Sequence, residues 1–239
     1  MLDIKYQATL FVNLKDIPPT PENVMTIMSL YIDQELQFIP GTSLEISRNN
    51  PTPIPRMNLI DRNNGWTINF GSNRIDIIKN SVDENGVGTI EDFTNKACSL
   101  FKLFFEKFNK KVHRISLVSS ALFKDMDLKK INSIYNKFSN PINFYKENEA
   151  EEWLVHSVAR VKYEISNLNE LVNISTDISR KLVDSSNQII NAIILDFDIN
   201  TNGENEDVRF ENLHFHEFYK KALNSRNIIV DDIKSYIYE

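Results

Sequence analysis

Two aspartates separated by one residue are the strongest candidate for chemistry in this sequence. Asp196 and Asp198 lie in the apolar run Ile194-Leu-Asp-Phe-Asp-Ile199. Side chains two positions apart on a β-strand point to the same face, so both carboxylates would lie together. With a third acid they would form the oxygen-rich site that Mg²⁺ takes in nucleotidyl transfer. The pair therefore predicts a metal site, with a divergent metal-dependent nuclease or nucleotidyltransferase as one alternative function.

A simpler interpretation places the same aspartates in cross-strand ion pairs. Arg160 and Lys162 alternate in the same way on the strand expected over 152–166. If the two strands were neighbours, these cations would face Asp196 and Asp198. The Gly-Ser turn that a nucleotidyltransferase carries just before its aspartates occurs only at residues 71–72, more than a hundred residues earlier. We therefore favour the ion pairs over the metal site.

Other reactive side chains lack the spacing that chemistry requires. His214 and His216 are two positions apart in an expected helix, so they do not share the face that a zinc ion needs. Cys98 lies in an apolar helical pattern, where a buried, inert thiol is the ordinary outcome. The Asp-x-Lys pairs of restriction-type nucleases begin at Asp3, Asp127 and Asp232. The first has no acid upstream and the others fall in expected helices, so we predict no catalytic centre and no cofactor.

A basic set of side chains gathers near the end of the expected helix over 90–110. It comprises Lys102, Lys107, Lys110, Lys111 and Arg114. Positive charge at a helix C-terminus complements the helix dipole. Beside exposed aromatic rings, the same charges would bind single-stranded nucleic acid, which gives a second alternative function. The net charge of −6 disfavours it, because neutralising phosphates supplies most non-specific affinity.

The strands and helices that carry these residues can be predicted from hydrophobic periodicity and turn residues. The stretch 57–80 predicts three short strands, joined by turns at Asn63-Asn64-Gly65 and Gly71-Ser72-Asn73. We expect further strands over 2–14, 44–47, 113–120, 152–166 and 188–200. We expect helices from Pro21 to before Pro40 and over 90–110, 127–138, 213–225 and 228–238, and a helical or mixed segment over 168–183. The prolines at 51, 53 and 55 indicate an extended connection with few ladder hydrogen bonds.

These elements predict an α+β fold with a mostly antiparallel sheet and packed helices. We expect one globular unit over 1–239, which divides into two similar fused halves, 1–148 and 149–239. The single cysteine and the absence of a secretory signal pattern indicate a cytoplasmic protein. The apolar runs are too short to span a bilayer, so no membrane association is expected.

Three stretches, in this order, carry a resemblance to a known family. They are 57–80 with its Phe70-Gly71 turn, the strand from Arg114 to Phe123 after a Phe-rich helix, and 194–199. With them the chain resembles a sporadically distributed family of uncharacterised bacterial proteins of similar length. The resemblance implies a bacterial or phage-borne accessory protein, such as a component of a defence or toxin–antitoxin system.

The sequence as a whole favours a non-catalytic protein that acts by binding. Exposed aliphatic and aromatic side chains on an open sheet face or edge would supply the contacts. The expected partner is another protein, and a homo-oligomer is a further alternative.

Overall fold

The structure is a computed structural model that describes residues 1–32, 34–47, 50–124, 126–185 and 188–238. Within these residues lie nine strands: β1 (Leu2–Phe11), β2 (Ile39–Ser47), β3 (Asn50–Asp61), β4 (Trp66–Phe70), β5 (Arg74–Asn80), β6 (Arg114–Phe123), β7 (Trp153–Ile165), β8 (Leu168–Ser185) and β9 (Gln188–Thr201). The helices described are α1 (Pro21–Tyr31), α2 (Ile90–Phe108), α3 (Leu128–Ser139), α4 (Asn143–Glu147) and α5 (Asn212–Tyr238).

All nine described strands form one antiparallel sheet in the order β2-β3-β4-β5-β1-β6-β9-β8-β7. The predicted α+β class with a mostly antiparallel sheet is confirmed. The hairpins predicted over 57–80 are β3, β4 and β5. Gly65, in the first turn, has φ +72°, and a Cβ atom there would lie 2.1 Å from the carbonyl oxygen of Asn80. Only glycine fits this turn without strain.

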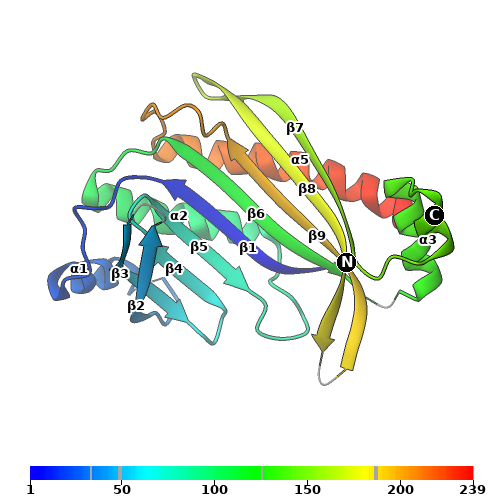
Figure 1. Ribbon diagram of the computed structural model, residues 1–239. Coiled ribbons are helices and arrows are strands. Elements are labelled where there is room, and N and C mark those ends of the chain that lie inside the picture. Colours follow the sequence, from blue (N-terminus) through cyan, green and yellow to red (C-terminus); the bar gives the residue numbers. More distant parts are fainter. Residues whose placement is uncertain (33, 48–49, 125, 186–187, 239) are drawn as a thin grey trace.

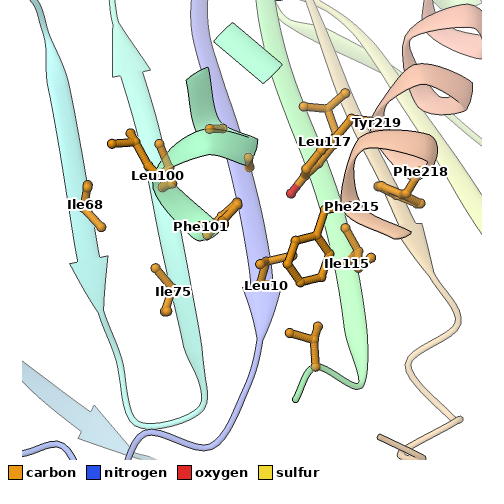
Figure 2. Packing of buried hydrophobic residues seen from close by; sticks show 14 of the residues in the cluster. Leu10, Ile68, Ile75, Leu100, Phe101, Ile115, Leu117, Phe215, Phe218 and Tyr219 are labelled. Carbon is orange, nitrogen blue, oxygen red and sulfur yellow. The ribbon is translucent and has the colours of Figure 1, made fainter. Parts of the chain in front are cut away.

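Two long helices cover one face of the sheet and leave the other open (Figure 1). α2 and α5 contact each other; α2 packs on β1, and α5 packs on β6 and β7. α2 begins at its N-cap Thr89, whose hydroxyl accepts a hydrogen bond from the amide of Asp92 at 3.1 Å. Between helices and sheet lies an aromatic core, in which the rings of Phe101 and Phe215 join the two helices with centroids 6.2 Å apart (Figure 2).

β8 differs from the helical or mixed segment predicted over 168–183. Leu171, Ile174 and Ile178 are three or four positions apart, as on one face of a helix. In the structure, strand alternation buries Ile174 and Ile178, whereas Leu171 remains 36% exposed. Leu182, the next residue of the helical pattern, is 57% exposed. The helical spacing therefore came from two apolar residues that the fold leaves outside its core.

The prolines at 53 and 55 belong to β3, which differs from the extended connection predicted for them. Pro55 stands opposite Leu44 of β2 in the ladder. This part of β3 has β2 on one side only, because β4 pairs with β3 over Asn58–Asp61. A residue without an N–H group is tolerated where one edge of a strand is unpaired.

α5 is a single helix of 27 residues, whereas the sequence predicted two helices over 213–225 and 228–238. Arg226 interrupts the apolar pattern at the expected break, yet its side chain is only 3% exposed. Its Nε donates to Ser119 Oγ on β6 at 2.9 Å, and its Nη2 donates to the carboxylate of Asp3 on β1. The helix continues through this position because the buried guanidinium finds partners in the sheet.

β1 and β6 lie side by side at the centre of the sheet order, and a similar sequence of elements follows each of them. Each is followed by helix, by antiparallel strands and then by a long helix. The division into halves 1–148 and 149–239 stays a prediction. Every helix in the described ranges is too short or too polar to span a lipid bilayer.

Candidate functional site

Asp198 lies on the open face of the sheet and is held by two uncharged donors. Its Oδ1 accepts hydrogen bonds from Ser116 Oγ on β6 and from Asn200 Nδ2, each at 3.0 Å. Arg114 Nη2 donates to Asn200 Oδ1 at 2.9 Å, so the guanidinium is linked to the aspartate through the amide. Asp198 is therefore a member of a polar network that joins β6 to β9.

Asp196 shares this face with Asp198, as predicted, but has a different environment. It stands opposite Ser120 of β6 on one side and opposite Asp177 of β8 on the other. Asp177 is in turn hydrogen-bonded to His156 Nδ1 of β7. Even so, no group of three or more His, Cys, Asp or Glu side chains in the described part of the chain is placed to hold a metal ion. Asp177 lies opposite Asp196, but together with Asp198 these acids do not form the metal-binding group that the prediction requires.

The predicted cross-strand ion pairs are not among the contacts of the described residues. Arg160 Nε donates instead to Asn173 Oδ1 of β8 at 3.0 Å. β8 lies between β7 and β9, so Arg160 and Lys162 are one strand too far away to face Asp196 and Asp198. The correction follows directly from β8, which the sequence pattern had placed in a helical or mixed segment.

The basic set does not form one continuous positive face. Lys110 Nζ is bonded to both carboxylate oxygens of Asp16, at 2.7 and 2.6 Å. Lys102 pairs with Glu106 of its own helix at 3.7 Å. Arg114 does not lie with the lysines, because its guanidinium packs 4.6 Å from the ring centroid of Phe11 on β1. Lys107 and Lys111 are exposed. The five residues of the basic set therefore do not form a continuous row of unpaired cations for a nucleic acid.

A cavity of about 540 Å³ opens where β7 begins beside β8 and β9. Asp196 lines it together with Asp177 and Ser179 of β8. The sequence pattern did not predict Asp177 and Ser179 as site residues, because it predicted a helical or mixed segment over 168–183 instead of a strand. The signal was present: polar residues at 173, 175, 177, 179 and 181 alternate with Val172, Ile174, Thr176 and Ile178.

The outer edge of the sheet at β7 is a second feature that the structure places clearly. β7 pairs with β8 over thirteen residues without a register shift, and the sheet order ends with it. Leu154 and Val158 on this strand are 61% and 55% exposed. On the helix side, an apolar groove of about 320 Å³ runs under the strand; Ile174, Ile178, Ile229 and Ile233 line it.

Comparisons with known proteins add a distant structural likeness. No family model matches the sequence, and no curated protein matches it. Among solved structures, the fold is similar to a rolling circle replication initiator protein from Geobacillus stearothermophilus, with a TM-score of 0.31 and 9% sequence identity over 92% of this chain and 78% of that chain. At this TM-score the likeness carries no argument about function. The role in a defence or toxin–antitoxin system stays a prediction.

Proposed function

We propose that this chain is a non-catalytic binding protein that recognises an extended segment of another protein along the free edge of β7. The observation that carries the proposal is the edge itself. β7 has thirteen residues in regular register and, among the described residues, a neighbouring strand on one side only. Its outer backbone groups offer a template for one more strand.

The opposite edge of the sheet offers a poorer template. β2 carries Pro40 within its ladder and has a register shift between Glu45 and Ser47. Proline and irregular pairing are two ways in which proteins protect an edge from added strands. β7 contains neither proline nor glycine. The contrast between the two edges favours β7 as the docking edge.

The charges and apolar surfaces beside β7 define the chemistry of the partner. Arg160 and Lys162 are exposed on the open face, and neither forms a salt bridge within the described part of the chain. The apolar groove lies beneath the strand on the other face. Because side chains of an added strand alternate between the faces, the fitting segment alternates acidic and apolar residues.

Two capped synthetic peptides test the proposal: one alternates valine with glutamate, and the other alternates valine with lysine. We expect the glutamate peptide to shift the backbone amide resonances of residues 153–165 and to protect outward-facing β7 amides from hydrogen exchange. It should bind about threefold to tenfold more tightly than the lysine peptide, because two cross-strand charge pairs change from attractive to repulsive.

A double charge reversal supplies the decisive variant. Arg160→Glu with Lys162→Glu should invert the preference, so that the lysine peptide binds more tightly. Lys107→Glu, on the exposed side of α2, is the matched control and should leave the preference unchanged. Two results would overturn the proposal: no effect of either peptide on β7, or a preference that the double variant does not alter. Self-association through β7 in light scattering would assign the edge to a second copy instead.

A further inference from the structure

The cavity of about 540 Å³ at the start of β7 has an acidic lining, in which Asp177 is hydrogen-bonded to His156 Nδ1 and the side chain of Asp196 has no partner among the described residues. Three acids contribute to it: Glu152, Asp177 and Asp196. Asp177 and Asp196 are directly opposite each other on β8 and β9. Among the hydrogen bonds and ion pairs of the described residues, none involves the side chain of Asp196, whereas the side chain of Asp198, two residues along the strand, has two donors. Asp196 therefore keeps its full capacity to accept hydrogen bonds.

Ser179 provides an independent observation that this cavity takes a ligand. It shares the open face with Asp177, two positions away on β8, and is one of the residues that line the cavity. Ser179 is only 4% exposed, and its Oγ has no hydrogen-bond partner among the described residues. Buried polar groups are almost always satisfied, so an unpaired hydroxyl beside two carboxylates indicates a missing partner.

The positive charges of the lining do not satisfy the acids. Arg180 donates to Asn191 Oδ1 at 3.0 and 2.8 Å and to the carbonyl oxygen of Ala150 at 2.8 Å, so its guanidinium is already engaged. Lys181 is exposed and forms no salt bridge within the described part of the chain. Among the lining residues three carboxylates stand against these two cations, and with His156 neutral, as a hydrogen-bond partner of Asp177, the net charge is negative.

We propose that this cavity binds an organic cation, an alkylammonium or guanidinium group. The charged head would donate to Asp177, Asp196 and Ser179 Oγ, turning two opposed carboxylates into a bridged pair. Leu154 and Leu182 line the same cavity and suit the methylene stem that such a head carries. An organic cation fits better than a metal ion, because the described residues form no metal-ligand group. The site shares Trp153 and Leu154 with β7, but it does not depend on the proposed docking of a strand.

Nuclear magnetic resonance of the indole N–H groups provides a direct test. The chain has two tryptophans: Trp153 lines the cavity, and Trp66 on β4 lies outside it. The probes are putrescine, lysine with both backbone ends blocked, and glutamate blocked in the same way. We expect the two cations to shift the Trp153 signal to saturation, with Trp66 unmoved and blocked glutamate inert. Higher salt should weaken the binding, because the carboxylates are only partly buried.

Variants connect the signal to the acids. Asp196→Asn should weaken putrescine binding about fivefold to tenfold, because it removes one charge-assisted hydrogen bond. Asp198→Asn is the matched control: it changes the same residue type, on the same strand and face, outside the cavity lining. Lys181→Gln should strengthen binding, because it removes a like charge.

Three outcomes would overturn the proposal: no movement of the Trp153 signal, equal movement of Trp66, or an unchanged affinity in Asp196→Asn. Binding of putrescine alone would support a free small amine as the ligand. Binding of blocked lysine as well would support a basic side chain of a protein. These probes cannot form a strand. Putrescine binding can therefore be detected even if no peptide binds along β7, and the two proposals are tested separately.

Discussion

Asp177 and Asp196 are placed directly opposite each other on neighbouring antiparallel strands. Like charges in this arrangement destabilise a sheet, by about 0.2–1 kcal/mol for each pair. Ser120 faces Asp196 from the other side and brings no compensating charge, and His156 is hydrogen-bonded to Asp177 but not to Asp196. Such a local conflict, in a sheet whose core is otherwise well packed, is typical of a binding site rather than of a stabilising contact.

Asp196→Asn should therefore stabilise the fold while it weakens cation binding. We expect the free energy of unfolding to rise by about 0.5 kcal/mol at neutral pH, because the repulsion from Asp177 is removed. Urea unfolding at low and high salt measures this gain, which should shrink as salt screens the charges. A loss of stability in the variant would contradict this account of the pair.

Asp198→Ala should have the opposite effect on stability. The substitution removes the acceptor of Ser116 Oγ and Asn200 Nδ2, two side chains that are only 5% and 6% exposed. Leaving buried donors unpaired costs about 1–3 kcal/mol. The same urea experiment checks it, and Asp198→Asn, which keeps an acceptor oxygen, should lose much less.

Arg226→Ala should be the most damaging of these substitutions. It leaves Asp3 and Ser119 without their partner, and it empties a position 5.6 Å from the ring centroid of Phe197. Breaking a buried charge pair by removing one member costs about 3–5 kcal/mol. Lys220→Ala, at an exposed site on the same helix, is the control. A loss below about 1 kcal/mol for Arg226→Ala would show that Asp3 finds a new partner, contrary to expectation.

His113 makes the stability depend on pH in a predictable direction. Burial first, and then the positive charges of Arg209 and Arg114, hold the pKa of His113 below its ordinary value of 6.5, although Glu206 opposes this. The unfolded chain therefore binds the proton at a higher pH than the folded chain does. The stabilisation is present above the ordinary pKa and is lost as the pH falls through it.

We accordingly expect the free energy of unfolding to fall between about pH 7 and pH 5, and to fall less in His113→Gln. Denaturant titrations of both proteins across this range give the difference directly. Equal slopes would show that the imidazole has the same proton affinity in the folded and unfolded chains.

Cys98 should be unreactive in the folded protein. Burial raises the pKa of its thiol to about 12, so almost no thiolate is present near neutral pH. Iodoacetamide should label the native chain slowly and the urea-unfolded chain at the rate of a free thiol. Rapid labelling of the native chain would instead indicate that α2 opens locally, since Cys98 lies on that helix.

Local patterns predicted those parts of the fold that depend on neighbouring residues. The hairpins from β3 to β5 follow from turn residues such as Gly65, and α2 follows from an apolar stripe that includes Phe93, Phe101 and Phe104, all buried as expected. The face shared by Asp196 and Asp198 also follows, because it requires only the alternation of a strand.

Features that depend on distant partners could not be predicted in the same way. The burial of Arg226 is set by Asp3 and Ser119, which lie 223 and 107 positions away. The strand β8 was missed because Leu171 and Leu182 completed a helical spacing, although the fold leaves both exposed. Because β8 was not predicted, Asp177 and Ser179 were also missed as residues that line the cavity together with Asp196.

The contact between Asp3 and Arg226 can form only late in synthesis of the chain, after Arg226 has been made. The two residues are 223 positions apart, so at ribosomal rates of about 5–20 residues per second the arginine is made roughly 10–45 s after its partner. The first strand therefore leaves the ribosome long before the helix that anchors it exists.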